Sequence, residues 1–145
     1  MATINASISV SSDIMSYPIS INKSMQIKKL ASCHGLDETT GLRTKKFGTV
    51  TTAAVIVEHD ELTDDKAHMV YIRNTTSNKA NFFYVAYNAS AAAATTTEVI
   101  GKLYGNDWML FPYNGNTNIT VASDGGIEQT LEYMVFADGI VTAAG

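Results

Sequence analysis

The sequence predicts an all-β domain built as an antiparallel sandwich of two sheets. Apolar and polar residues alternate at 4–10 and again at 19–27, and a period of two puts successive side chains on opposite faces of a strand. Turn signals separate the apolar segments, among them an Asn-Gly pair at 114–115 and an Asp-Gly pair at 124–125. Hairpins favour such pairs because these residues tolerate a positive φ. A jelly-roll-like arrangement is our first expectation, and an immunoglobulin-like sandwich is the alternative, since the Cys–Trp–Cys pattern of antibody domains is absent.

The expected strands follow one another along the whole chain. After the two alternating segments, further β-rich segments bring the total to eight or nine strands, the segment 98–104 being the optional one. From residue 69 onward the turns are close together, which is typical of an antiparallel meander or Greek key rather than of βαβ units. These further segments are 47–58, 69–73, 81–87, 98–104, 108–111, 118–122 and 129–136.

The chain of 145 residues is expected to form a single domain spanning 1–145. We expect an extended N-terminal arm at residues 1–12. The segment 32–46 is polar and contains Gly35 and Gly41, so we expect a long surface loop there. Loops of this kind are where contacts between proteins concentrate.

Composition points to a protein that contacts other proteins. The net charge is −4, which argues against a nucleic-acid partner because phosphate binding needs a concentrated positive patch. Charged residues make up 17% of the chain, below the usual ~25%, and a surface of small neutral side chains costs little to bury against a neighbour. The apolar runs are far shorter than the roughly 20 residues that span a bilayer, so we expect no membrane partner.

No constellation of residues indicates catalysis, so we expect no catalytic residue, no cofactor and no metal. The chain has three histidines, His34, His59 and His68, and one cysteine, Cys33, without the spacing of a metal site. The acidic residues within 60–65 lack the central glycine of an EF-hand loop. We interpret them as a solvated turn.

Aromatic residues are concentrated in the C-terminal half. In the run 82–84, alternation puts Phe83 on the face opposite its two neighbours. We expect Phe83 to point outward into a subunit contact, and a core covered by a loop is the alternative. A carbohydrate-binding sandwich is an alternative of another class. It would use Trp108, Tyr113 and Asn114 as its platform.

The C-terminal half resembles a small virion structural protein of tailed bacteriophages. The resemblance is carried by 70–78, 82–87, 100–105, 108–112 and 131–136: a strand ending in Asn, a polar turn, and an apolar strand ending in Pro. It implies a non-catalytic capsid decoration (cement) protein that binds the exterior of the head and reinforces contacts between major capsid subunits. Its partner would be the major capsid protein or another virion protein. Its location would be the virion, after synthesis in the host cytoplasm.

The alternative within this class is a tail-tube, connector or fibre-base component, in which a long hairpin in the region 19–30 would complete a sheet between subunits. We expect a homo-oligomer in either case, with a trimer preferred. The residues expected at protein interfaces are Ile4, Ile8, Arg43, Lys45, Phe83 and Tyr113.

Overall fold

The computed structural model describes residues 4–27, 36, 38–87 and 99–141. Within these residues it contains strands and one 3-10 turn, and no α-helix. The elements are β1 (Asn5–Ser12), β2 (Ile19–Gln26), β3 (Glu38–Thr39), β4 (Arg43–Phe47), β5 (Ala53–Val57), η1 (His59–Glu61), β6 (His68–Asn74), β7 (Phe82–Tyr87), β8 (Val99–Tyr104), β9 (Trp108–Tyr113), β10 (Ile119–Ser123) and β11 (Gln129–Ala137).

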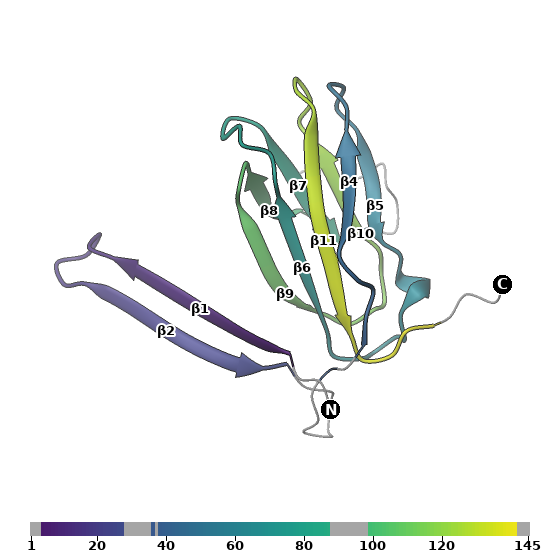
Figure 1. Cartoon of the computed structure of the whole chain (residues 1–145), viewed down its shortest axis with the longest axis horizontal. Helices are drawn as coiled ribbons and strands as arrows, with labels where there is room; N and C mark the ends of the chain where they lie inside the picture. Colours follow the sequence, from purple (N-terminus) through teal and green to yellow (C-terminus); the bar gives the residue numbers. More distant parts are fainter. Residues whose placement is uncertain (1–3, 28–35, 37, 88–98, 142–145) are drawn as a thin grey trace.

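Two antiparallel sheets form a sandwich, as predicted. One sheet has the strand order β5-β10-β7-β8. The other has the order β3-β11-β6-β9, and β4 also pairs with β11, beside β3. Figure 1 shows the two layers stacked, with β6, β9 and β11 in one and β7, β8 and β10 in the other. These orders are compatible with both the jelly-roll and the immunoglobulin-like forms of the prediction.

The core lies between the two sheets. Along β6 the side chains alternate between buried and half-buried, with Val70 and Ile72 fully buried, and β11 does the same at Leu131 and Val135. Residues from both sheets complete the cluster. They are Phe47, Ile56, Val57, Leu62, Val70, Ile72, Phe83, Val85, Leu103, Tyr113, Ile119, Val121, Leu131, Val135 and Ala137.

The sequence-based strand and loop boundaries are wrong between residues 38 and 58. The expected loop 32–46 contains two strands, β3 and β4, both paired with β11; residues 32–35 and 37 lie outside the described residues. The expected strand 47–58 is two strands, because the chain leaves one sheet after Phe47 and enters the other at Ala53. Strand β4 is mostly polar and exposed. Charged edge strands of this kind avoid pairing with other chains, and they carry no hydrophobic signal.

The glycines of the predicted C-terminal turns have positive φ, but the turns are not hairpins. Gly115 has φ of 84°, and Gly125 and Gly126 have φ of 76° and 87°. The expected hairpins at 114–115 and 124–125 are wrong, because the turn before β10 and the turn after it each join strands of different sheets. Asn106 also has a positive φ, 71°, and it lies in the turn between β8 and β9. Asparagine tolerates this conformation better than most residues.

The expected N-terminal arm is one strand of a hairpin. Strand β1 pairs with β2 over its full length, from Asn5 opposite Gln26 to Ser12 opposite Ile19; residues 1–3 lie outside the described residues. This two-stranded sheet is separate from both layers of the sandwich and projects from one end of it (Figure 1). We call residues 4–27 the arm.

Candidate assembly surface

The arm has one apolar and one polar face. In an antiparallel pair, residues directly opposite each other share a face. Val10 lies opposite Ile21, and Ala6 lies opposite Met25, on the same face. We call this the apolar arm face; it consists of Ala6, Ile8, Val10, Ile19, Ile21 and Met25, with Lys23 opposite Ile8 as its one charged member.

The other face of the arm carries only small polar side chains. Ser7 lies opposite Ser24 and Ser9 opposite Asn22, and the Ser9 hydroxyl donates a hydrogen bond of 2.8 Å to Asn22 Oδ1. Four apolar side chains of the apolar arm face are exposed, with Ile8 at 50%, while Ala6 and Ile19 are half-buried. A two-stranded hairpin alone is marginally stable in water, so this exposed apolar ribbon is a surface that a partner would cover.

A second apolar surface lies on the outside of the β11–β6–β9 layer. Because Val70, Ile72, Leu131 and Val135 point into the core, the residues between them point outward. Cross-strand pairing aligns them on one face. We call this the outer sheet face; its members are Met69, Tyr71, Trp108, Leu110, Pro112, Met134 and Phe136.

This composition is unusual for an antiparallel sandwich, whose outward residues are normally polar. Trp108 is 56% exposed, and the other members are half-buried or exposed. Arg73 and Glu132 accompany them on this face, and the Tyr71 hydroxyl is a third polar group there. The layer is therefore apolar on both sides, although only its inner side is covered by the second sheet.

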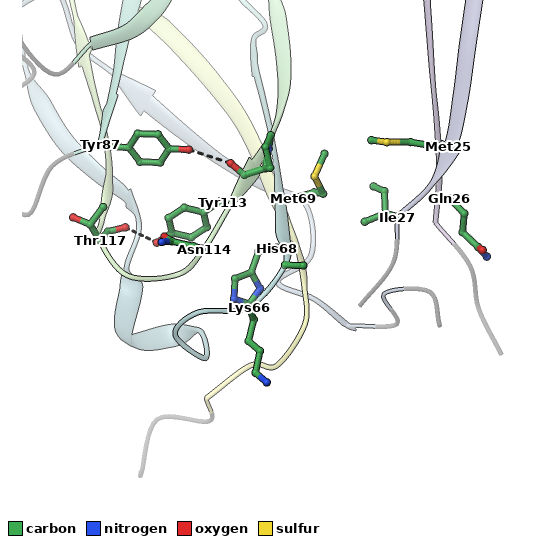
Figure 2. Close-up of a pocket in the computed structure, with 12 residues that line it drawn as sticks. Met25, Gln26, Ile27, Lys66, His68, Met69, Tyr87, Tyr113, Asn114 and Thr117 are labelled. Atoms are coloured by element: carbon green, nitrogen blue, oxygen red, sulfur yellow. Dashed lines mark hydrogen bonds between the residues drawn. The ribbon is translucent and has the colours of Figure 1, made fainter. Parts of the chain in front are cut away.

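The arm and the outer sheet face border a set of open grooves. One groove of about 650 Å³ is lined by Met25 and Ile27 from the arm and by Met69, Pro112 and Tyr113 from the sandwich. Figure 2 shows Met25 and Ile27 on one side of it and Met69 on the other, while Gln26 points away.

Two further grooves extend along the same surfaces. One of about 710 Å³ joins Ile4 and Ala6 to Trp108 and Phe136, and one of about 230 Å³ joins Ile8 and Met25 to Trp108. The two apolar faces thus oppose each other across open space.

Hydrogen bonds fix the polar groups at the edges of this surface. Tyr71 donates a hydrogen bond of 2.8 Å to the Glu132 carboxylate. Burial of the ring, followed by this hydrogen bond and the Glu132 charge, raises the pKa of Tyr71 above its usual value of 10. The hydroxyl therefore stays protonated and holds Glu132 on the outer sheet face.

The groove of Figure 2 ends at two stacked tyrosines. The rings of Tyr87 and Tyr113 are 6.2 Å apart and nearly parallel. Tyr87 donates to the Pro112 carbonyl and Tyr113 to the Thr117 carbonyl (Figure 2). Burial raises the pKa of both hydroxyls, and for Tyr113 the nearby Tyr87 and Asp64 add to the effect. These are stable, neutral hydrogen-bond donors that fasten β9 and its following turn.

Two of the expected interface residues are core residues. Phe83 is 0% exposed, and its ring meets Phe47 edge to face at 4.9 Å. Tyr113 is 4% exposed. The expectation that Phe83 points outward is wrong, because β7 places Phe82 and Tyr84 on the outside and Phe83 between the sheets.

The other four expected residues lie on the surface but not together. Ile4 lines the groove with Trp108, and Ile8 belongs to the apolar arm face. Arg43 is held by Glu61, with 3.0 Å between the guanidinium and the carboxylate. Lys45 is exposed on β4. The fold therefore brings Ile4 and Ile8 to one surface and leaves Arg43 and Lys45 at an edge of the sandwich.

The residues expected for a carbohydrate platform do not share a face. Trp108 points outward, whereas Tyr113, five residues later on the same strand, points into the core. A separate aromatic group lies outside β7 and β8, where Phe82 meets Tyr84 and Tyr104. The Lys102 ammonium lies 4.5 Å from the centre of the Phe82 ring, so this group is internally paired.

The buried histidine outside this surface has structural partners. His68 is buried; one ring nitrogen is 2.8 Å from the Thr63 carbonyl and the other accepts the Asp138 backbone N–H at 3.0 Å. In the described part of the chain, no three His, Cys, Asp or Glu side chains gather as metal ligands would. Cys33 and His34 lie outside the described residues. Among the residues that the structure places, no helix has the length and hydrophobicity of a membrane span.

Most of the outer sheet face was missed by sequence reasoning. Met69, Leu110, Met134 and Phe136 are apolar residues in strands, and the sequence marks such residues as core. The available signal was that both sets of alternating positions are apolar or aromatic along β9 and in the second half of β11. That pattern occurs in strands covered on both sides.

Comparisons of the chain with protein-family models, with curated proteins and with solved structures each gave no match.

Proposed function

We propose that this protein is a non-catalytic structural component of a virion. The first candidate role is that of a capsid decoration protein, which binds the head exterior and reinforces contacts between major capsid subunits. The observation that supports an assembling protein is the pair of uncovered apolar surfaces, the apolar arm face and the outer sheet face. Contiguous exposed apolar patches are often sites of contact with other proteins. The placement in a virion rests on the resemblance of the C-terminal half.

Such a protein would act through binding alone. A ligand that binds only the assembled shell stabilises it by RT ln(1 + [L]/Kd), about 2.7 kcal/mol per site at a free concentration of about 100 times Kd. Summed over the many equivalent sites of a shell, this increment would resist disassembly. The protein would be made in the host cytoplasm and function in the virion as a homo-oligomer, with a trimer preferred.

The arm favours a second candidate of the same class. A projecting hairpin has two strand edges that can pair with strands of other subunits. Both edges of the β1–β2 sheet are unpaired among the described residues. A tail-tube, connector or fibre-base component would use the arm in this way, and such a protein would form rings or tubes without capsids.

The test is to measure the mass of the purified protein by light scattering, alone and mixed with capsids assembled without it. Saturation at a fixed number of copies per capsid supports decoration. Rings or tubes in electron micrographs of the protein alone support the tail or connector candidate instead. Absence of both binding and self-assembly contradicts the proposed class.

A pair of arm variants tests whether the apolar arm face contributes. Ile21→Asp puts a charge on the apolar arm face, and Ser20→Asp puts the same charge on the polar face of the same strand. Burying an unpaired charge is costly, so we expect Ile21→Asp to weaken capsid binding at least about 10-fold, which is ~1.4 kcal/mol. Ser20→Asp should bind like the unmodified chain. Equal binding by the two variants would show that the apolar arm face is not used.

A further inference from the structure

We propose that the apolar arm face docks on the outer sheet face of a second copy of this chain, each copy giving one arm and receiving one. This deepens the proposed function, since it names the two surfaces through which the homo-oligomer forms. It rests on that function only in taking the protein to be one that assembles.

Within one chain the two faces border the same grooves without closing them. Ile8 and Met25 of the arm share a groove of about 230 Å³ with Trp108 and Leu110, and the wider grooves separate the rest of the arm base from Met69 and Phe136. The residue pairs that would meet in a closed contact are therefore already opposed. In arm exchange, the same pairs meet between two copies.

The outer half of the arm has no surface of its own chain to contact. Trp108 is the first residue of β9 and lies at the end of the sheet, opposite Arg73. Residues beyond Ile8 and Lys23 line none of the three grooves described above. These residues include Ile14, which is 83% exposed, and Tyr17 and Ile21. A contact within one chain would leave this half in water, whereas a second copy can cover it.

The two faces match in length and in charge. Strands β1 and β2 have 8 residues each, and β6, β9 and β11 have 7, 6 and 9. At about 3.3 Å per residue, both faces are roughly 20–30 Å long. The apolar arm face has one charged residue, Lys23. On the outer sheet face, the Glu132 carboxylate can form an ion pair with this ammonium group, and the exposed Trp108 ring can form a cation–π interaction with it.

The area requires a reciprocal contact. A ribbon about 26 Å long and two strands, about 10 Å, wide covers roughly 260 Å². One docked arm therefore removes roughly 520 Å² from water when both sides are counted, which is in the range of crystal-packing contacts. Two arms exchanged between two copies remove roughly 1,040 Å², which reaches the size of a specific interface at about 1,000 Å². In a closed ring in which every copy gives and receives one arm, each copy buries the same area as in the exchanged dimer, divided between two contacts of roughly 520 Å² each.

The test is chemical cross-linking between two differently labelled variants in a Cys33→Ser background. One chain carries Ile8→Cys on the apolar arm face, and the other carries Trp108→Cys on the outer sheet face. Each chain has a single cysteine, so no link can form within one chain. A linked product therefore reports contact between two copies. With a short bismaleimide, we expect the Ile8→Cys and Trp108→Cys pair to link at least about fivefold more than either variant links with its own kind.

The matched control is Ser9→Cys, one residue away on the polar face of the same strand, which lines none of the three grooves. It should link to Trp108→Cys at background level.

Three outcomes would overturn the proposal. Preferred linking between two Ile8→Cys chains would mean contact between arms. Equal linking of Ser9→Cys and Ile8→Cys to Trp108→Cys would mean that the apolar arm face is not the contacting face. Linking only within a chain that carries both Ile8→Cys and Trp108→Cys would mean that the arm closes on its own sheet.

Light scattering of the purified protein gives an independent measurement. The unmodified chain should be a dimer or a closed ring, and Trp108→Ser should shift it towards the monomer, with the dissociation constant raised at least about 10-fold. A monomeric unmodified chain at high concentration would overturn arm exchange. If the monomer still saturated capsids, the proposed function would hold although arm exchange had failed. The two measurements therefore distinguish failure of arm exchange from failure of the proposed function.

Discussion

Replacing Phe83 by alanine is expected to lower the free energy of unfolding by about 3–5 kcal/mol. The side chain is fully buried, and its ring packs edge to face on Phe47 at 4.9 Å. Truncation removes the apolar contacts of the ring and leaves a cavity between the two sheets, and both effects contribute to this cost. For a domain with a total stability of about 5–15 kcal/mol, the loss is a large fraction.

The assay is unfolding by urea and by heat, followed by circular dichroism. At about 2–4 °C per kcal/mol for a chain of this size, Phe83→Ala should lower the melting temperature by roughly 6–20 °C. Phe83→Leu keeps most of the volume and should cost roughly 1–2 kcal/mol. This milder variant stays folded and allows the oligomeric mass to be compared with that of the unmodified chain.

The matched variant is Trp108→Ala, which removes a large aromatic ring that is more than half exposed. It should change the unfolding free energy by about 1 kcal/mol or less and should act mainly on assembly. If Phe83→Ala instead changed the free energy of unfolding by less than about 0.5 kcal/mol and weakened assembly, Phe83 would point outward and this prediction would be wrong.

Two further predictions concern a close approach and the tyrosines. A Cβ on Gly105 would overlap the backbone carbonyl of Asn78, so Gly105→Ala should lower the free energy of unfolding in urea by about 1–3 kcal/mol or more. A Cβ on Gly101 would meet no atom within 4 Å, so Gly101→Ala should lower it much less. Equal losses in the two variants would contradict the close contact at Gly105. The hydroxyls of Tyr87 and Tyr113 have pKa values raised above 10. Above about pH 10 the unfolded chain therefore binds fewer protons than the folded chain. The free energy of unfolding should then fall by up to ~1.4 kcal/mol per pH unit for each group. Urea midpoints between about pH 9 and pH 11.5 measure this slope, which should be shallower in Tyr113→Phe; an unchanged slope would exclude Tyr113 as a source.

Local sequence signals were sufficient for most of the strands and turns. The segment 129–136 became β11, and a turn lies at 124–126 as predicted, with positive φ at both glycines, although it connects the two sheets instead of closing a hairpin. These features depend on residues near one another in the chain, so a single sequence contains the information. The edge strand β4 was missed because an exposed polar strand has no apolar alternation to detect.

The candidate surface was only partly accessible to the same reasoning. Ile4 and Ile8 were expected at an interface and do lie on the arm, beside the grooves. The outer sheet face was missed, since apolar residues such as Leu110 and Phe136 would normally be assigned to a core. Identifying this face requires knowing that β6, β9 and β11 are neighbours, and those strands are far apart in the sequence.

Local sequence pattern was enough to predict that this chain is rich in strands, where most of its turns fall, and which residues share a face of each strand. Which face is covered depends on tertiary packing. Strands β1 and β6 both carry apolar residues at every second position, yet Val70 and Ile72 are buried while Ile8 and Val10 are exposed. In the run 82–84 tertiary packing also decided that Phe83, not Phe82, points into the core. The physical reason is that alternation is a property of one strand, whereas burial depends on a second layer supplied by distant parts of the chain.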